Sequence, residues 1–227
     1  GTVHLIEGAL RAGVTRLVFS SSAAVYGNPD RVPVDETATI RPENVYAETK
    51  ATMERVIRWY GMTRGLRWVS LRYFNAAGAA DDGSIGEDWS LTTNLVPLVM
   101  KAALGAGGSV SVFGADYPTP DGTGIRDYVH VEDLASAHAA ALDHLRAGKD
   151  DVTLNLGTGH GSSVKEVLTA TSRVCGHPVP HEFVARRPGD PAVVYAETSL
   201  AERTLGWKAT RGLDAIIESA FAWHASR

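Results

Sequence analysis

The strongest constraint on the fold is an apolar strand, a long helix and a second apolar strand in direct succession. Residues 15–20 (TRLVFS) and 68–72 (WVSLR) carry the branched and aromatic side chains typical of short buried strands. Between them, apolar residues recur at helical spacing over 46–60, and either Gly61 or Gly65 can end that helix. A strand–helix–strand unit predicts parallel strands covered by helices.

The rest of the chain continues this alternation. The pattern predicts helices and strands at the following positions: helices over 3–10, 93–104, 132–146 and 214–223, strands over 110–113 and 152–156, and a capping box at 163–166 that opens a further helix. Residues 81–90 and 116–124 are too rich in polar residues, glycine or proline for regular structure. The chain is therefore expected to be an α/β protein.

Composition excludes several classes of protein. The chain has 227 residues, is 44% apolar and 21% charged, and has a formal net charge of −4. These values exclude a disordered chain and give no reason to expect nucleic acid or an anionic membrane as a partner. No apolar run is long enough for a membrane span. A single cysteine, Cys175, excludes a disulfide scaffold and predicts a reducing compartment, the cytoplasm.

Tyr46 and Lys50 form the pair with the clearest chemistry. A spacing of four residues places both side chains on one helix face, about one turn apart. A neighbouring ammonium favours the phenolate form of a tyrosine, which can then take a proton from an alcohol. The same pair also fits an ordinary pair of surface neighbours.

Serines at the end of the first strand favour a catalytic role for the Tyr46–Lys50 pair. Residues 20–27 (SSSAAVYG) follow the strand directly, and ligands of open parallel sheets lie beyond the carboxyl ends of the strands. Ser22 can there hydrogen-bond a substrate oxygen and the tyrosine hydroxyl. The alternative is a polar strand exit whose serines bond to their own backbone.

These motifs, with several strings downstream, carry a resemblance. After SSSAAVYG and Tyr-x-x-x-Lys come LRYFN (71–75), NLVP (94–97), VFGADYPTPDGTGIRDYVHV (112–131), NLGTG (155–159), RRPGD (186–190) and LGW (205–207). In this order they resemble the UDP-glucose 4-epimerase family of the extended short-chain dehydrogenase/reductase superfamily. The long string is highly specific, and the match runs over essentially the whole chain.

The resemblance implies NAD-dependent epimerisation at C4 of a UDP-hexose, UDP-galactose to UDP-glucose, through a 4-keto intermediate. By the family pattern Tyr46 is the general base, Lys50 keeps it acidic and holds a ribose hydroxyl of the nicotinamide half, and Ser22 bonds the sugar 4-oxygen. Phe74 lies near the nicotinamide. The implied catalytic residues are Tyr46, Lys50 and Ser22, and the implied cofactor contacts are the same three with Phe74.

The family pattern also implies a cradle for UDP. Its residues are those that meet the diphosphate, uracil or ribose: Ser22, Tyr46, Asn75, Asn94, Leu95, Ser111, Val112, Phe113, Arg126, Arg187, Asp190 and Val194. Guanidinium groups at Arg126 and Arg187 suit phosphates. Taken singly, Phe113 fits a core residue, Arg126 a surface ion pair and Asn75 a turn; only their joint order favours the site. No metal is expected.

One position departs from the family pattern, and a second leaves open which sugars are accepted. Ala47 follows the tyrosine where relatives usually have glycine, and alanine is the better helix former. The bulk near Val194 bears in relatives on whether N-acetylated sugars fit, and valine leaves that open.

Two other signals are interpreted as structural. The glycine-rich stretch 157–161 (GTGHG) lacks the third glycine of a dinucleotide loop and predicts a tight turn. Cys175, His177 and His181 are metal-ligand types, but the prolines between them favour a loop.

Rival functions remain at this point. A nucleotide-sugar dehydratase would carry Asp-Glu where residues 23–24 are Ala-Ala, which argues against it. Another nucleotide-sugar epimerase, or a non-catalytic UDP-sugar-binding fragment, stays open.

The resemblance implies that the first βα units, with their glycine-rich loop, are absent, so the chain is expected to be a truncated, impaired enzyme. The expected domains are 1–75, the C-terminal part of an NAD-binding Rossmann domain, and 76–227, a smaller C-terminal α/β domain that binds UDP-sugar. Residues 129–160 are expected to return to the partial Rossmann-type parallel sheet. A homodimer through the first two helices is expected when the protein is intact.

Overall fold

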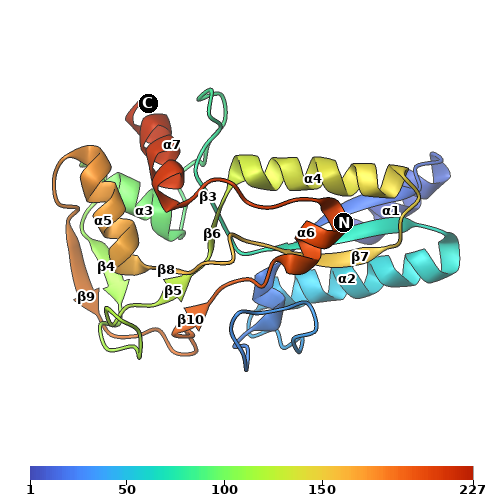
Figure 1. The fold of residues 1–227 in the computed structure, drawn as a ribbon, viewed down its shortest axis with the longest axis horizontal. Coiled ribbons are helices and arrows are strands. Elements are labelled where there is room, and N and C mark those ends of the chain that lie inside the picture. The colour runs from blue at the N-terminus through green and yellow to red at the C-terminus, as the bar shows by residue number, and fades with distance from the viewer. Residues whose placement is uncertain (227) are drawn as a thin grey trace.

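Three strands lie side by side in one parallel sheet, as the sequence pattern predicts. They are β1 (Arg16–Ser22), β2 (Arg67–Tyr73) and β7 (Val152–Leu156), in the order β1-β2-β7. The three strands run side by side in Figure 1. In this computed structural model, which describes residues 1–226, Val69 lies between Val18 and Val152 across the sheet. The predicted α/β fold with a parallel sheet is confirmed.

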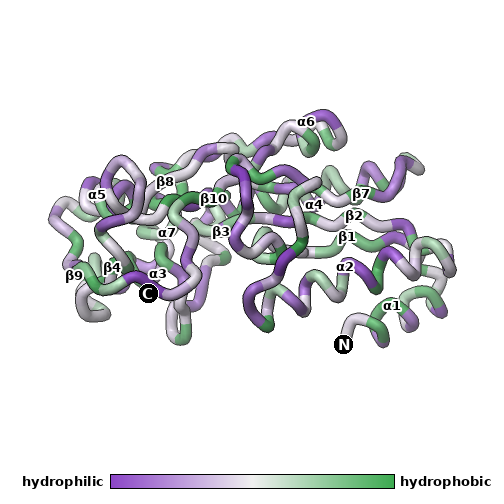
Figure 2. Tube along the Cα trace, turned by 90° about the horizontal axis from the view of Figure 1, so that it is seen from below, coloured by the Kyte–Doolittle hydropathy of each residue, from purple (hydrophilic) through white to green (hydrophobic). Residues whose placement is uncertain are grey.

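Helices cover both faces of this sheet. The helices concerned are α1 (Thr2–Arg11), α2 (Val45–Arg64) and α4 (Val131–Arg146). On one face Ile6 of α1 and Ile57 of α2 pack with Trp68, and α1 and α2 run close together there (Figure 2). On the other face Ala137 and Ala141 of α4 pack against the sheet residues of the second core. Alternate residues of β1 therefore face different helices.

Local sequence sets the ends of α2. The Asn44 side chain accepts a hydrogen bond from the Ala47 N–H at 2.9 Å and caps the helix at its start. Gly65, with φ +69°, ends it, so Gly65 rather than Gly61 is the stop. Gly61 stays inside the helix, where an added Cβ would lie 2.8 Å from the Trp68 indole nitrogen.

The second half of the molecule has its own core. Its helices and longer strands are α3 (Leu95–Ala103), β4 (Val110–Phe113), α5 (Val164–Cys175), β9 (His181–Val184) and α7 (Leu213–Ala225). β4 and β9 pair in parallel and lie beside α3 and α5 (Figure 1). Apolar residues such as Met100, Val167 and Ile217 of the three helices form one core. The capping box of Ser163 and Glu166 is confirmed.

Several short elements join the two halves. They are β3 (Asn75–Ala77), β5 (Ile125–Arg126), β6 (Tyr128–His130), β8 (Ser162–Ser163), β10 (Val193–Val194) and α6 (Ser199–Leu205). β3 pairs with β6, and β5 lies between β10 and β8. The sequence pattern does not predict them. The predicted start of α3 at residue 93 is too early. The Asn94 N–H donates to the Thr92 hydroxyl, so residues 92–94 form a turn before the helix.

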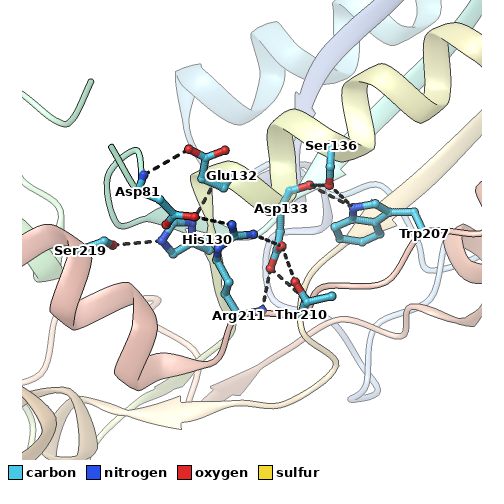
Figure 3. Close-up of polar contacts among 9 residues, drawn as sticks. All are labelled: Asp81, His130, Glu132, Asp133, Ser136, Trp207, Thr210, Arg211 and Ser219. Carbon is cyan, nitrogen blue, oxygen red and sulfur yellow. Dashed lines mark hydrogen bonds and ion pairs between the residues drawn. The ribbon is translucent and has the colours of Figure 1, made fainter. Parts of the chain in front are cut away.

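A buried carboxylate ties the start of α4 to the segment before α7. Asp133 is 2% exposed and accepts hydrogen bonds from the backbone N–H groups of Thr210 and Arg211, both at 2.9 Å (Figure 3). The Arg211 guanidinium lies 3.0 Å from the same carboxylate. Burial alone would raise the pKa of Asp133, but these hydrogen bonds outweigh burial and lower it below its usual value.

His130 caps the same helix from inside the molecule. It is fully buried, its Nδ1 accepts the Glu132 N–H at 3.1 Å, and its Nε2 lies 3.0 Å from the Ser219 hydroxyl (Figure 3). Burial, and then Arg211, lower the pKa of this imidazole. The neutral ring is the form that can accept at Nδ1 and donate at Nε2.

Within residues 1–226, every helix is too short or too polar to cross a membrane.

Candidate active site

The exit of β1 presents a serine to a cavity. Ser22 is followed by a 3₁₀ helix (Ala23–Tyr26), and its hydroxyl oxygen accepts the Ala24 N–H at 3.2 Å. Ser22 therefore caps this short helix while its own O–H proton stays available as a donor. The residue is 8% exposed, so it lies at the floor of the site.

Tyr46 and Lys50 approach the same place from the first two turns of α2. Lys50 Nζ donates to the Ser20 carbonyl at 2.8 Å and lies 5.6 Å from the centre of the Tyr46 ring. The Tyr46 side chain is 52% exposed. The helix cap at Asn44 fixes the turn that carries Tyr46. The phenol is thus open to a ligand, and the ammonium lies beside it.

A cavity of about 540 Å³ connects this end of the molecule with the second half. Twelve of the fourteen residues predicted for the site line it: Ser22, Tyr46, Phe74, Asn75, Asn94, Leu95, Ser111, Val112, Phe113, Arg126, Arg187 and Asp190. Lys50 lies behind Tyr46 and does not line the cavity. Val194 lines an adjoining cavity of about 770 Å³ that shares Ser22 and Phe74 with the first.

Two guanidinium groups enter the cavity from different segments. Arg126 of β5 forms an ion pair with Asp190 at 3.2 Å. The Arg187 guanidinium stacks 3.7 Å above the centre of the Phe113 ring. The cavity therefore has a cationic side, suited to phosphate, beside an aromatic platform.

The start of α3 faces the cavity with free backbone donors. The Asn94 side chain makes no capping hydrogen bond to the helix; its Nδ2 donates to Glu87 at 3.0 Å instead. The first backbone N–H groups of a helix have no partner within it, so the N–H of Leu95 can meet an anion.

Asp127 organises three segments around the cavity. Its carboxylate accepts hydrogen bonds from the backbone N–H groups of Thr158, Gly159 and Ala196, and its carbonyl accepts both the backbone and side-chain N–H of Asn75. Burial raises the pKa of Asp127, and the hydrogen bonds oppose that rise. The glycine-rich turn at 157–161 thus surrounds a carboxylate of its own chain, which agrees with the predicted tight turn.

Sequence reasoning missed several tyrosines of the cavity wall. Tyr73, Tyr117 and Tyr128 line it. Burial raises the pKa of Tyr128 to about 12, so its hydroxyl stays protonated. The buried Tyr117 hydroxyl has no hydrogen-bond partner within residues 1–226. The signal lay in the string 112–131, where both Tyr117 and Tyr128 stand.

The residues of metal-ligand type lie apart from this cavity. Cys175 ends α5, and its thiol lies 3.1 Å from the His177 carbonyl, while His181 opens β9. His138 of α4 contacts the Ser20 hydroxyl at 2.9 Å on the far side of β1 from α2. In the described part of the chain, no three His, Cys, Asp or Glu side chains gather as metal ligands would.

Comparison with known proteins gives consistent matches along the chain. Residues 1–157 match the model of the NAD dependent epimerase/dehydratase family. A UDP-glucose 4-epimerase of Streptococcus mutans is 46% identical over 227 residues, which are all of this chain and 68% of the relative.

Solved structures agree with this match. The crystal structure of UDP-glucose-4-epimerase from Stenotrophomonas maltophila with bound NAD and formylated UDP-arabinopyranose superposes with a TM-score of 0.96 at 45% identity, covering 99% of this chain and 68% of that one. The enzyme from Bifidobacterium longum in complex with NAD⁺ and UDP gives 0.91 at 42% identity, with 99% and 68% covered.

Proposed function

The chain belongs to the NAD dependent epimerase/dehydratase family, and on that premise we propose that it interconverts UDP-galactose and UDP-glucose by inverting C4 of the hexose. The observation that carries the proposal is the lining of one cavity. It brings Ser22 and Tyr46 together with the cationic and aromatic residues Arg126, Arg187 and Phe113. A UDP-sugar offers hydroxyl, phosphate and base groups that suit these side chains.

The residues present fit NAD at the tyrosine end. Lys50, hydrogen-bonded to the Ser20 carbonyl, keeps further ammonium N–H groups for a ribose hydroxyl, and Phe74 offers an apolar surface beside Ser22. NAD, when bound, supplies the oxidation at the sugar C4 and its reversal, so that a 4-keto sugar lies between the two epimers. Relatives with bound NAD support this assignment.

Tyr46 moves the proton. Its phenolate takes the proton of the sugar 4-hydroxyl and returns it on the reverse step, as a single base can in both directions. Lys50 stabilises the negative phenolate from the next helical turn. Ser22, whose oxygen is engaged by the Ala24 N–H, donates its own proton to the sugar 4-oxygen.

The second half of the molecule binds the UDP group while the sugar rotates. The Leu95 N–H at the start of α3, with Asn75 and Asn94, meets the diphosphate. Arg126 and Arg187 neutralise the phosphates. The cavity residues 111–113 border the uracil, and Asp190 accepts a ribose hydroxyl once Arg126 turns to the phosphate.

The test is an assay of the intact protein that carries these residues, with NAD and UDP-galactose. UDP-glucose is the expected product. UDP-4-keto-6-deoxyglucose as the sole product would assign the chain to the dehydratases, and tight UDP-sugar binding without turnover would make it a binding module. A parallel assay with UDP-N-acetylgalactosamine decides whether the space beside Val194 admits an N-acetyl group.

The polypeptide of these 227 residues alone is proposed to bind NAD weakly. Its residues include no Gly-x-x-Gly-x-x-Gly loop for the pyrophosphate, and β1 is an edge strand of the three-stranded sheet within residues 1–226. Calorimetric titration of NAD into this polypeptide is expected to give an affinity far below that of the intact protein. Equal affinities would refute the proposal.

We further propose that residues 1–75 and 129–160 form the cofactor side and the remaining residues the UDP-sugar side. The intact protein is proposed to be a homodimer through α1 and α2, whose outward side chains Leu5, Trp59 and Met62 are each more than 60% exposed. A free Cys175 supports a cytoplasmic location.

A further inference from the structure

A network of hydrogen-bonded polar side chains is buried between α2 and the sheet. It contains an acid, a base, a serine, a tyrosine and an asparagine, each at most 5% exposed: Ser21, Tyr26, Glu54, Arg72 and Asn155. Buried charges are rare in proteins and are usually paired. None of these five residues lines either cavity, so the proposed chemistry does not use them directly.

The centre of this network is an ion pair in which Arg72 bonds both oxygens of the Glu54 carboxylate. Arg72 donates from Nε to Glu54 Oε1 at 2.8 Å and from Nη2 to Oε2 at 2.5 Å. The third donor, Nη1, reaches the Tyr26 hydroxyl at 2.9 Å, and that hydroxyl donates to Asn155 at 2.7 Å. Burial raises the pKa of Tyr26 to about 12, which keeps it a donor.

Glu54 also reaches the strand that ends at Ser22. The Ser21 hydroxyl donates to Glu54 Oε1 at 2.5 Å. Four residues earlier on α2, Lys50 donates to the Ser20 carbonyl at 2.8 Å. Residues 46, 50 and 54 lie on one face of α2, so two successive turns of this face are bonded to the two residues directly before Ser22.

A buried ion pair is a weak source of stability, because apolar residues of similar volume usually stabilise a core as well or better. Its directional hydrogen bonds do fix the relative placement of the elements that carry them. Here the ion pair joins α2, which carries Glu54 and Tyr46, to β2, which carries Arg72. The hydrogen bond from Ser21 to Glu54 adds β1, which ends at Ser22. Catalytic proton transfer is sensitive to such placement.

We propose that Glu54 is a positioning residue: by holding Ser21 and Arg72 together it fixes the distance between Tyr46 on α2 and Ser22 at the end of β1. The proposal rests on the proposed epimerase function. It predicts that loss of the pair lowers turnover of the sugar while UDP binding, which lies in the other half of the molecule, is unaffected.

The test compares variants of the intact protein. Glu54→Met with Arg72→Met removes both charges without leaving one buried alone, and Ser21→Ala removes the hydrogen bond to β1. Glu48→Gln is the matched control, because Glu48 lies on the same helix in an exposed pair with Arg55. For each variant kcat is expressed per UDP-binding site, counted by calorimetric titration, so that unfolded molecules do not contribute.

The double variant is expected to lower kcat at least tenfold and Ser21→Ala at least threefold, with KM for UDP-galactose within twofold of wild type. The control should match wild type. A wild-type kcat in the folded double variant or in Ser21→Ala would overturn the positioning role.

A second readout does not depend on catalysis. Backbone amides of residues 20–26 should exchange hydrogen faster in the double variant and in Ser21→Ala than in wild type, and unchanged exchange would also overturn the proposal. A wild-type protein without turnover refutes the epimerase function instead, and amide exchange then decides the positioning role alone.

Discussion

The Lys50 ammonium lies 5.6 Å from the centre of the Tyr46 ring, one helical turn along α2. The two side chains share the helix face that meets the end of β1. The proposed base and the cation proposed to stabilise it thus belong to one helix, which limits how far their separation can vary.

Replacing Tyr46 by phenylalanine should abolish proton transfer and leave UDP binding intact. General acid–base catalysis contributes about 10²–10⁴-fold, so kcat should fall by at least about 100-fold with KM little changed. Steady-state kinetics with UDP-galactose measure this. Tyr60→Phe is the control: Tyr60 is on the same helix, and its hydroxyl bonds to Glu7 outside the cavity. An active Tyr46→Phe variant contradicts the assignment.

Asp133→Asn should destabilise the protein at neutral pH by about 1–3 kcal/mol, because it removes the charge of a buried carboxylate that pairs with the partly exposed Arg211 and weakens backbone hydrogen bonds. The lowered pKa of Asp133 sets the sign of the pH dependence. Its stabilising contribution is present above the unfolded pKa of about 4 and is lost as pH falls through the folded value.

Thermal melting of wild type and Asp133→Asn from pH 7 to pH 3 tests this. The gap between the two melting temperatures should be largest at neutral pH and shrink below about pH 4. Asp143→Asn, in an exposed pair with Arg146, should change little at any pH. A gap that widens in acid would show that the carboxylate does not contribute in this way.

Gly157→Ala should disturb the cavity through Asp127. An added Cβ would lie 2.4 Å from the Asp127 carboxylate, so the turn or the carboxylate must shift, at a cost of about 1–3 kcal/mol. Since Asp127 also bonds Asn75, KM for UDP-galactose should rise along with the loss of stability. Gly8→Ala, in α1 with open space around the new Cβ, should not raise KM. An unchanged KM for the Gly157 variant would show that this turn does not influence the binding of UDP-galactose.

Trp59→Glu should convert a dimer of the intact protein into monomers. Trp59 is 63% exposed on α2, and a charge there opposes burial against a second copy. Sedimentation velocity measures the change. Ile85→Glu, at a site 71% exposed in a loop outside α1 and α2, should leave the dimer intact. A dimer that survives Trp59→Glu places the interface elsewhere.

The longer elements could be predicted because their signals are local. The helix over 45–64 carries its own cap and stop, and the strands 110–113 and 152–156 have the predicted limits. The short strands could not, because two residues carry no periodicity. Ile125 is in a strand only because Val193 and Ser163 come beside it from distant parts of the chain.

The functional residues also fall into a group that the sequence predicts and a group that it does not. The order of the motifs predicts twelve of the residues that line the cavity, from Ser22 to Asp190. Nothing in the spacing of Glu54 and Arg72 pairs them, and charged residues in a helix and a strand normally face water. Their contact arises only when α2 folds back over β2, and it is visible only in three dimensions.

The repeated passage of the chain between the two halves has a mechanical consequence. After β2, β6, β7, β10 and α6 the backbone crosses from one half to the other (Figure 1). These backbone connections, together with the hydrogen bonds of Asp133 that join α4 to the segment before α7, oppose a hinge-like opening between the halves. If the two halves keep a fixed separation, the proposed epimerase function requires the hexose itself, and not the protein, to rotate so that both of its faces meet one base.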